Sequence, residues 1–173
     1  MDKSFFMQDA EKVARELLGC VLVRKIGNRE KKARIVETEA YYGERDPASR
    51  ARQNGDLRKT MLMKPGTLLV YGVHNNWLLN FVNSREGKAE AVLIRALEPL
   101  NFEGKCNGPG LLTKSMLIDK RFHKQNLFGN KEIWLKKREK DLVIERSFRI
   151  GVSKDLKKKL RFYIKNNEFV SRK

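Results

Sequence analysis

The alternation of apolar and polar residues predicts that most of this chain forms β-strands. Residues 20–26 are rich in β-branched side chains, the pair Gly27-Asn28 is a turn signal, and residues 33–41 alternate strictly. We therefore expect a hairpin of 20–26 against 33–41. The same patterns predict further strands at 67–71, 77–82, 91–99, 131–136, 141–152 and 160–165.

Two short helices are expected between these strands. Apolar residues recur at helical spacing over 9–18, where Asp9 is the predicted N-cap and Gly19 the predicted end. A second helix, about 110–118, follows the sequence NGPG, whose proline suits a first helical turn. The intervening segment 44–66 is predicted to be a long irregular loop.

The strand 33–41 is unusual because it carries two carboxylates. One interpretation is that Glu37 and Glu39 are surface acids paired with nearby lysines, and the other is that they form an acid/base pair. Strict alternation predicts which side chains share a face. One face is expected to hold Ile35, Glu37, Glu39 and Tyr41, and the other Val36, Thr38, Ala40 and Tyr42.

The net charge of the chain indicates which kind of partner it attracts. Its 173 residues include 38 Lys+Arg and 21 Asp+Glu, which give a formal net charge of +17. Such a protein attracts polyanions, most commonly nucleic acid, through neutralised phosphates and released counterions. Anionic membranes and ribosomes are competing partners, and a general enrichment in lysine is a further source of the excess.

The remaining composition predicts a single domain, residues 1–173, that buries its own core. No apolar run is long enough to span a membrane and the N-terminus lacks a signal peptide, so a cytoplasmic or nucleoid-associated protein is expected. Cys20 and Cys106 stand apart, with only His74 and His123 as possible co-ligands. No metal site is therefore expected.

Basic residues are spread through the segment 44–66 instead of forming one block. This distribution suits a loop that follows a phosphate backbone, and the alternative is a solvated, flexible loop. The candidates for contact with the backbone of a nucleic acid are Arg45, Arg52, Arg58 and Lys64.

Three polar residues lie where apolar strands or a turn are predicted. Asn80 interrupts an apolar strand, so its amide is either a structural bridge or a group aimed into a pocket. A buried Arg95 needs a carboxylate or phosphate partner, and Glu37 or Glu39 would serve if their strands are neighbours. His74 in the predicted turn 72–76 has a planar ring that could wedge into a duplex, although most turn histidines have no such role.

Five runs occur in order along the chain: RIVETEAY (34–41), KPGTL (64–68), AVLIRALEP (91–99), NGPG (107–110) and LRFY (160–163). Together, over about residues 9 to 171, they resemble the alkyladenine (3-methyladenine, or methylpurine) DNA glycosylase family. The resemblance implies an α+β fold, a single domain with a curved, largely antiparallel β-sheet flanked by short helices. The strands and hairpins predicted above agree with this architecture.

The resemblance also implies roles for individual residues. Glu39 matches the general base, which would deprotonate the water that attacks C1′ of the lesion's deoxyribose, and Arg95 matches the arginine that helps to hold this water. Tyr41 and Tyr71 match the aromatics that stack on the flipped base, and Asn80 matches the amide that screens the purine.

His74 falls where the family places the side chain that fills the gap left in the base stack. The hairpin is one residue shorter than in longer members, so Val73 is the alternative wedge. Glu37 is expected to be structural, as the ion-pair partner of a basic loop residue.

One position departs from the family. A histidine often forms the third stacking wall at the position where this chain has Arg50. An arginine can stack on a base through its guanidinium plane, but it repels a base that alkylation has made cationic. This predicts weaker selectivity for 3-methyladenine and 7-methylguanine relative to neutral hypoxanthine or ethenoadenine. If the register of the loop differs, Arg50 binds phosphate instead.

The activity implied by the resemblance is that of a monofunctional DNA-3-methyladenine glycosylase. Such an enzyme flips damaged purines out of double-stranded DNA, hydrolyses the N-glycosidic bond and leaves an abasic site without cutting the strand. A monomer without cofactor is expected. The main alternative is a non-catalytic basic protein that binds DNA, RNA or the ribosome. A relative that has lost excision and a formyltransferase-like enzyme are further alternatives.

Overall fold

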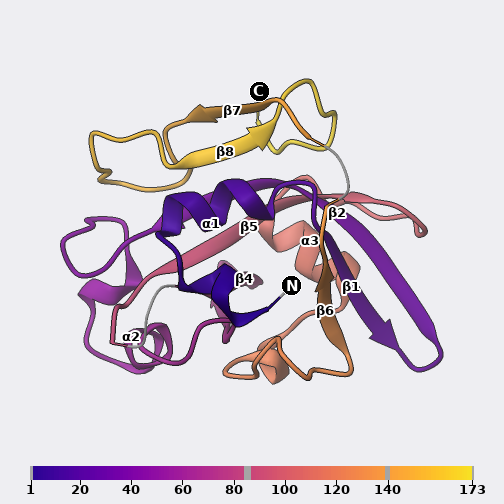
Figure 1. The fold of residues 1–173 in the computed structure, drawn as a ribbon, viewed down its shortest axis with the longest axis horizontal. Coiled ribbons are helices and arrows are strands. Elements are labelled where there is room, and N and C mark those ends of the chain that lie inside the picture. The colour runs from indigo at the N-terminus through magenta and orange to yellow at the C-terminus, as the bar shows by residue number, and fades with distance from the viewer. Residues whose placement is uncertain (1, 84–86, 139–140, 173) are drawn as a thin grey trace.

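Eight antiparallel strands form one curled sheet in a computed structural model of the protein, which describes residues 2–83, 87–138 and 141–172 (Figure 1). The main path has the order β3-β4-β5-β2-β1-β6, while β8 pairs with β2 and with β7. The α+β fold predicted from the sequence is confirmed. The strands are β1 Val21–Ile26, β2 Arg29–Tyr41, β3 Leu68–Val73, β4 Asn76–Val82, β5 Ala91–Pro99, β6 Ile133–Lys136, β7 Ile144–Ser147 and β8 Arg161–Ile164.

Short helices flank this sheet. Asp9 caps α1 by accepting a hydrogen bond from Glu11 N at 2.9 Å, and Gly19, with a φ of 82°, follows its end, so both predicted signals are confirmed. The second predicted helix also forms and begins at its proline. The helical segments are η1 Lys3–Met7, α1 Ala10–Leu17, η2 Arg50–Arg52, α2 Asp56–Met61, α3 Pro109–Met116 and η3 Lys120–Phe122.

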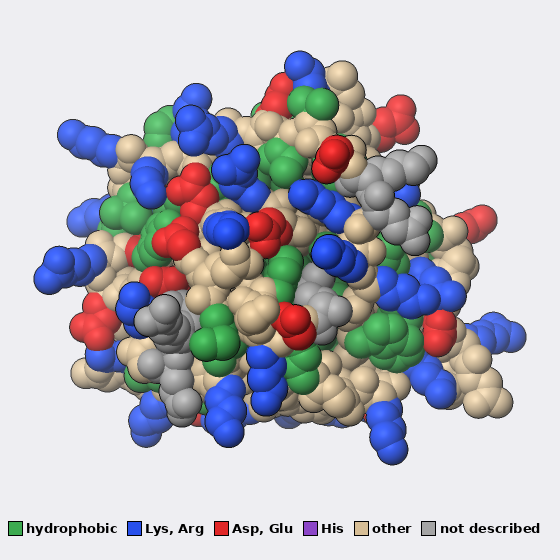
Figure 2. Space-filling view, viewed as in Figure 1, with side chains coloured by type: hydrophobic (Ala, Val, Ile, Leu, Met, Phe, Trp, Pro, Cys, Tyr) green, Lys and Arg blue, Asp and Glu red, His purple; other side chains and the backbone are tan. Residues whose placement is uncertain are grey.

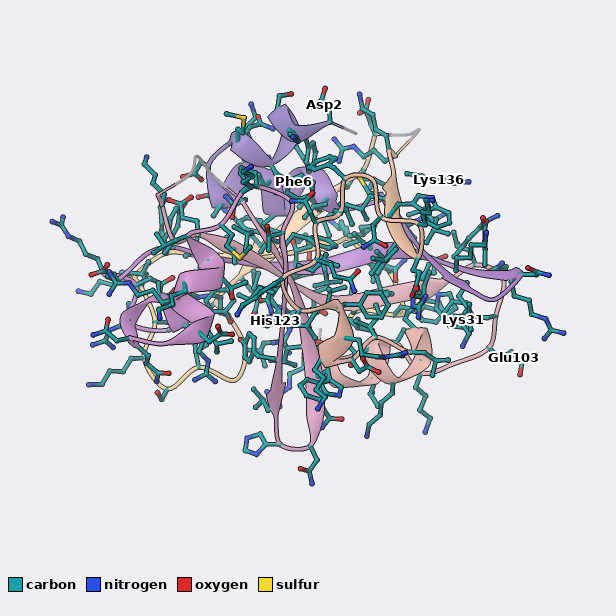
Figure 3. The ribbon with its side chains drawn as sticks, turned by 90° about the horizontal axis from the view of Figure 1, so that it is seen from below. Asp2, Phe6, Lys31, Glu103, His123 and Lys136 are labelled. Atoms are coloured by element: carbon teal, nitrogen blue, oxygen red, sulfur yellow. The ribbon has the colours of Figure 1, made fainter. Side chains whose placement is uncertain are left out.

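Both predicted hairpins form, with tighter turns than expected. In the first, Ile26 pairs with Arg29, so β2 begins well before residue 33. In the second, only His74 and Asn75 form the turn, with φ of 47° and 58°. Positive φ at both central residues matches the right-handed twist of the flanking strands. The β3–β4 hairpin therefore narrows to a two-residue tip, and Figure 3 shows it projecting from the body of the protein.

Two predictions about irregular and extended structure are wrong. The segment 44–66 is neither irregular throughout nor freely solvated, because it contains η2 and α2 and buries Ala51 and Met61. The predicted strand 141–152 is reduced to β7, after which the chain leaves the sheet as a loop. Side-chain contacts hold both segments in place, and such contacts produce no periodic pattern in the sequence.

Strict alternation also fails within β2, because the β2–β5 ladder contains two bulges. One extra residue lies in β2 between Ile35 and Glu37, and the extra residue in β5 is Arg95. A bulge changes which face the following side chains occupy. Ile35 therefore packs in the main core, and its predicted place beside Glu37, Glu39 and Tyr41 is wrong.

The two faces of the sheet bury different clusters. The main core lies on the face covered by α1 and α3, where Thr38 also ties β2 to α1 through a 2.8 Å hydrogen bond to Ala14 O. The opposite face carries a smaller cluster beneath η2 and α2. Tyr71 packs against this smaller cluster, which consists of Ala51, Met61, Leu69, Val82, Ala89 and Ala91.

We expect the substitution Gly110→Ala to destabilise the protein. An added Cβ would lie 2.6 Å from Asn76 Cβ, because α3 begins directly against the β3–β4 hairpin. Overpacking of this kind lowers the free energy of unfolding by about 1–3 kcal/mol, which denaturant titration measures. Gly43→Ala is the control, since its nearest neighbour would be Ala89 O at 3.9 Å. Equal losses in the two variants would show that this contact is not tight.

Candidate active site

A cleft of about 570 Å³ opens where six parts of the chain meet. They are the end of β2, the segment 47–53, the β3–β4 hairpin, the middle of β5, the start of α3 and the loop 150–153. Of the residues predicted from the sequence, the structure brings Tyr41, Arg50, Tyr71, His74 and Arg95 to the lining of this one cleft.

Glu39 lies directly behind the cleft and is fully buried. Its Oε1 accepts a hydrogen bond from Ile150 N at 2.7 Å, and its Oε2 accepts one from the Tyr41 hydroxyl at 2.8 Å. Burial raises the pKa of Glu39, against the opposing effects of Arg95 and the Ile150 N–H. A buried carboxyl with a raised pKa beside a cleft is suited to general acid or base chemistry.

Arg95 connects Glu39 to Glu37. Its Nε lies 3.3 Å from Glu37 Oε1 and its Nη1 lies 3.3 Å from Glu39 Oε1, while Nη1 also donates to Ile150 O at 3.2 Å. The expected pairing of Arg95 with these two carboxylates is confirmed. The interpretation of Glu37 and Glu39 as surface acids is wrong, since neither side chain is exposed to solvent.

Glu37 is surrounded by protein donors and does not line the cleft. Its Oε1 accepts hydrogen bonds from Arg161 Nε at 2.6 Å and from the Ser171 hydroxyl at 2.9 Å, and its Oε2 accepts one from Ser171 N at 2.7 Å. Its guanidinium partners, Arg95 and Arg161, come from β5 and β8. The expected partnership of Glu37 with a basic loop residue is therefore wrong, and its contacts fix the C-terminal segment to the sheet.

A second buried ion-pair network, which was not predicted from the sequence, lies next to the cleft. Arg149, in the loop after β7, donates to both oxygens of Asp46 at 2.7 Å and to Asp155. It also donates to Ala40 O at 2.9 Å, and its guanidinium carbon lies 4.5 Å from the centre of the Tyr41 ring. Nothing in the sequence distinguishes this arginine from the many exposed basic residues.

Two tyrosines form walls of the cleft, and each has a guanidinium over one ring face. Arg149 covers Tyr41, and Arg50 lies over Tyr71 with its guanidinium carbon 5.3 Å from the ring centre. Burial, and secondarily the nearby Glu39 charge, raise the pKa of Tyr41 well above its ordinary value. The Tyr41 hydroxyl therefore remains protonated and donates to the carboxylate.

Asn80 lies deeper than these walls. Its Nδ2 donates to Leu69 O at 3.0 Å, and its side chain borders a small cavity of about 20 Å³ that Tyr41, Arg50 and Tyr71 also line. Asn80 is therefore both a bridge between strands and a wall of a cavity next to the cleft. The two interpretations of this amide, a structural bridge and a group in a pocket, thus hold together.

The candidate wedge residues lie at the mouth of the cleft. His74, at the exposed hairpin tip, and the half-buried Val73 both line it. His123 lies at the base of the same hairpin (Figure 3). Its ring accepts a hydrogen bond from Val70 N at 3.2 Å and pairs with Asp56 at 2.9 Å. The hairpin is thus anchored at its base while its tip is free to meet a ligand.

The four basic residues expected at a phosphate backbone lie outside the cleft. Three of them are exposed, whereas Arg58 pairs with Glu44 and donates to Asn54 Oδ1 at 2.9 Å. Figure 2 shows lysine and arginine side chains distributed over one face with acidic side chains between them. The exposed three are Arg45, Arg52 and Lys64.

The described residues contain no group of His, Cys, Asp and Glu side chains placed to hold a metal ion. None of the helices in this part of the chain is long and apolar enough to cross a bilayer.

An aromatic cleft with a buried carboxyl behind it, in a strongly basic protein, agrees with the class of enzymes that act on nucleic acid. Residues 4–168 match the family model described as methylpurine-DNA glycosylase. The chain belongs to the methylpurine-DNA glycosylase family. It is accordingly a hydrolase of base excision repair whose macromolecular substrate is DNA.

Relatives that cover nearly the whole chain agree with this assignment. A protein of Borrelia garinii subsp. bavariensis is 42% identical over 100% of both chains. One of Aeropyrum pernix is 40% identical over 99% of this chain and 93% of its own. One of Legionella pneumophila is 37% identical over 99% of this chain and 98% of its own. Each carries the name "Putative 3-methyladenine DNA glycosylase".

We expect the two neighbouring carboxylates to differ in their effect on stability. Glu37→Gln leaves the buried Arg161 without its charged partner, which lowers the free energy of unfolding by about 3–5 kcal/mol. The pKa of Glu39 is higher in the folded than in the unfolded state, so its ionisation reduces stability as pH rises through that raised value. Glu39→Gln cannot ionise, and Arg95 keeps Glu37 as its partner.

Glu39→Gln is therefore expected to be at least as stable as the wild type at pH 7. Denaturant titration of both variants at this pH measures the difference. A loss in Glu39→Gln as large as that in Glu37→Gln would refute this division between the two acids.

Proposed function

We propose that this protein acts as a monomer that flips damaged purines out of double-stranded DNA and hydrolyses their N-glycosidic bond with a water activated by Glu39. The proposed lesions are 3-methyladenine, 7-methylguanine, hypoxanthine and ethenoadenine. The observation that carries the proposal is the buried Glu39 carboxyl, with its raised pKa, behind a cleft with two tyrosine walls. The names of the relatives, which specify 3-methyladenine, support the same class of substrate.

In the proposed reaction, the flipped base stacks on Tyr41 and Tyr71, and Arg95 helps to hold the water. Glu39 Oε2 accepts one hydrogen bond from Tyr41, and its remaining lone pair is available to take a proton from water. The water oxygen bonds to C1′ while the C1′–N bond breaks, and the electron pair of the broken bond leaves with the purine. The products are the free base and an abasic site.

The other contacts would select and position the substrate. Asn80, in the small cavity behind the tyrosines, would screen the edge of the purine. His74 is the more exposed of the two candidate wedges and would fill the gap in the base stack, with Val73 as the alternative. Arg45, Arg52, Arg58 and Lys64 are proposed to contact the DNA backbone, although Arg58 would first have to leave Glu44.

The cleft favours hydrolysis without strand cleavage. A lyase step needs an amine that forms a Schiff base with the sugar, and lysine is the usual donor. Among the described residues that line the cleft, none is a lysine. The protein is therefore proposed to be monofunctional.

We expect Glu39→Gln to lose excision by at least about 10²-fold, the usual contribution of a general base. The assay is incubation with a hypoxanthine-containing duplex, followed by hot alkali that cleaves abasic sites. Glu103→Gln removes one negative charge from an exposed position far from the hairpin and should keep wild-type activity (Figure 3). Excision that survives in Glu39→Gln would remove this residue from the mechanism, and a wild type that binds the duplex without excision would favour the non-catalytic alternative.

Arg50 is proposed to bias the protein toward neutral lesions. Its guanidinium lies over Tyr71 and lines both the cleft and the small cavity. Arg95 and Arg149 each have a carboxylate oxygen within 4 Å, whereas Arg50 has none among the described residues. An unneutralised positive charge beside the base disfavours a lesion that is itself cationic.

We expect Arg50→His to lower the ratio of hypoxanthine to 7-methylguanine excision by about tenfold, which corresponds to ~1.4 kcal/mol. Single-turnover rates on matched duplexes at pH 8, where histidine is neutral, measure this ratio. Arg52→His removes the same charge from the same turn but lies outside the cleft, so it should affect both lesions equally. An unchanged ratio in Arg50→His would contradict the proposed bias.

A further inference from the structure

The loop after β7 holds the ion pair with the least exposed side chains among the described residues, Arg149 with Asp46. The side chains of Arg149 and Asp46 have no exposed surface, and that of Asp155 is 17% exposed. Arg149 donates to Asp46 through both Nη atoms and to Asp155 through Nε at 2.9 Å. Although burial by itself lowers the pKa of Arg149, its bonds to Asp46 and Asp155 outweigh this effect, so the pKa is raised and the charge is permanent.

This network meets the proposed reaction centre at two points. The guanidinium of Arg149 covers the Tyr41 ring and donates to Ala40 O. The next residue, Ile150, donates its N–H to Glu39 Oε1 and accepts from Arg95 through its carbonyl. Of the two peptide groups that flank Ile150, one thus contacts Glu39 and the other contacts Arg95, and their positions depend on where Arg149 is held.

We infer that Arg149 is a positioning residue, which aligns the Glu39 carboxylate through Ile150 and fixes the plane of the Tyr41 ring. This inference rests on the proposed function. Arg149 is buried and therefore does not contact DNA, so it acts through these two residues.

A structural role alone accounts poorly for this arrangement. A fully buried ion pair adds little net stability, because desolvation of its charges offsets their attraction, and an apolar replacement is often equally stable. A guanidinium instead fixes the relative positions of its partners, because its planar group of N–H donors points in fixed directions to several acceptors at once. Here those acceptors come from three separate places in the chain, namely Ala40 at the end of β2, Asp46 and Asp155.

Displacement of the loop should change the ionisation of Glu39 in a definite direction. The charged or titratable groups that face Glu39 are Arg95 from β5, Tyr41 and Glu37 from β2 and, more weakly, Tyr71 from β3. Ile150 contributes its N–H. That N–H lowers the pKa of Glu39, so its loss raises the pKa further. Since a general base must be ionised, the acid limb of the rate profile moves to higher pH.

The test compares Arg149→Lys with Arg24→Lys. Lysine keeps the charge but cannot donate to three separate acceptors in fixed directions. Arg24 is a close match, because its side chain is only 6% exposed, pairs with a carboxylate and lies, like that of Arg149, 4.5 Å from an aromatic ring centre. Arg24 lies in β1 over Phe122, outside the cleft.

We expect Arg149→Lys to lower the single-turnover excision rate by roughly 10–100-fold, because small misplacements of reacting groups have effects of this size. Its acid limb should move to higher pH, and its affinity for the lesion duplex should stay within about twofold of the wild type. Arg24→Lys should lose comparable stability yet keep the wild-type rate and profile. Asp155→Asn, which keeps the shape of the side chain, should show a smaller change in the same direction as Arg149→Lys.

The outcomes separate this inference from the function on which it rests. If the wild type excises no lesion, the proposed function fails. If the wild type is active and Arg149→Lys loses stability but keeps the rate and the acid limb, the positioning role is overturned. If Arg149→Lys does not fold, Asp155→Asn decides the matter, and an unchanged rate and profile in that variant would overturn the inference.

Discussion

Burial of two carboxylates on one strand is the constraint on which the site depends. Glu37 and Glu39 both lie in β2 without exposed surface, and like charges so placed require a shared cation. Arg95 supplies it from the neighbouring strand β5. Bulges in both strands accompany this contact, so that the acids and the arginine share the face opposite the main core. The charges and the bulged backbone therefore form one unit.

The two acids differ because their remaining partners differ. Glu37 accepts hydrogen bonds from Arg161 and Ser171, which compensate its charge and tie the C-terminal segment to the sheet. The negative charge of Glu39 is compensated less fully than that of Glu37, and burial raises the pKa of Glu39. A carboxylate that is costly to ionise in the folded protein is a better proton acceptor. The same burial that reduces stability at Glu39 is thus what suits it to the proposed role of base.

Positive charge has two distinct uses in this structure. Arg95, Arg149 and Arg161 are buried and paired with carboxylates, so they organise the site without adding to the field around the protein. Most of the excess of +17 lies on exposed side chains spread among acidic ones, as Figure 2 shows for one face. This distribution agrees with DNA as the substrate, because many weak phosphate contacts attract a duplex without selecting a sequence.

Local spacing and short motifs along the chain were enough to predict the hairpins, the capped helix α1, the antiparallel sheet and the family. The sequence also indicated that Arg95 needs an acidic partner, since an arginine within an apolar strand must be neutralised. Three features could be seen only in the folded protein: the bulge that separates Ile35 from Glu37, the helical packing of 44–66 and the Asp46–Arg149–Asp155 network. These features join residues up to about a hundred positions apart. They arise from burial and charge pairing between distant residues, which leave no periodic pattern along the chain.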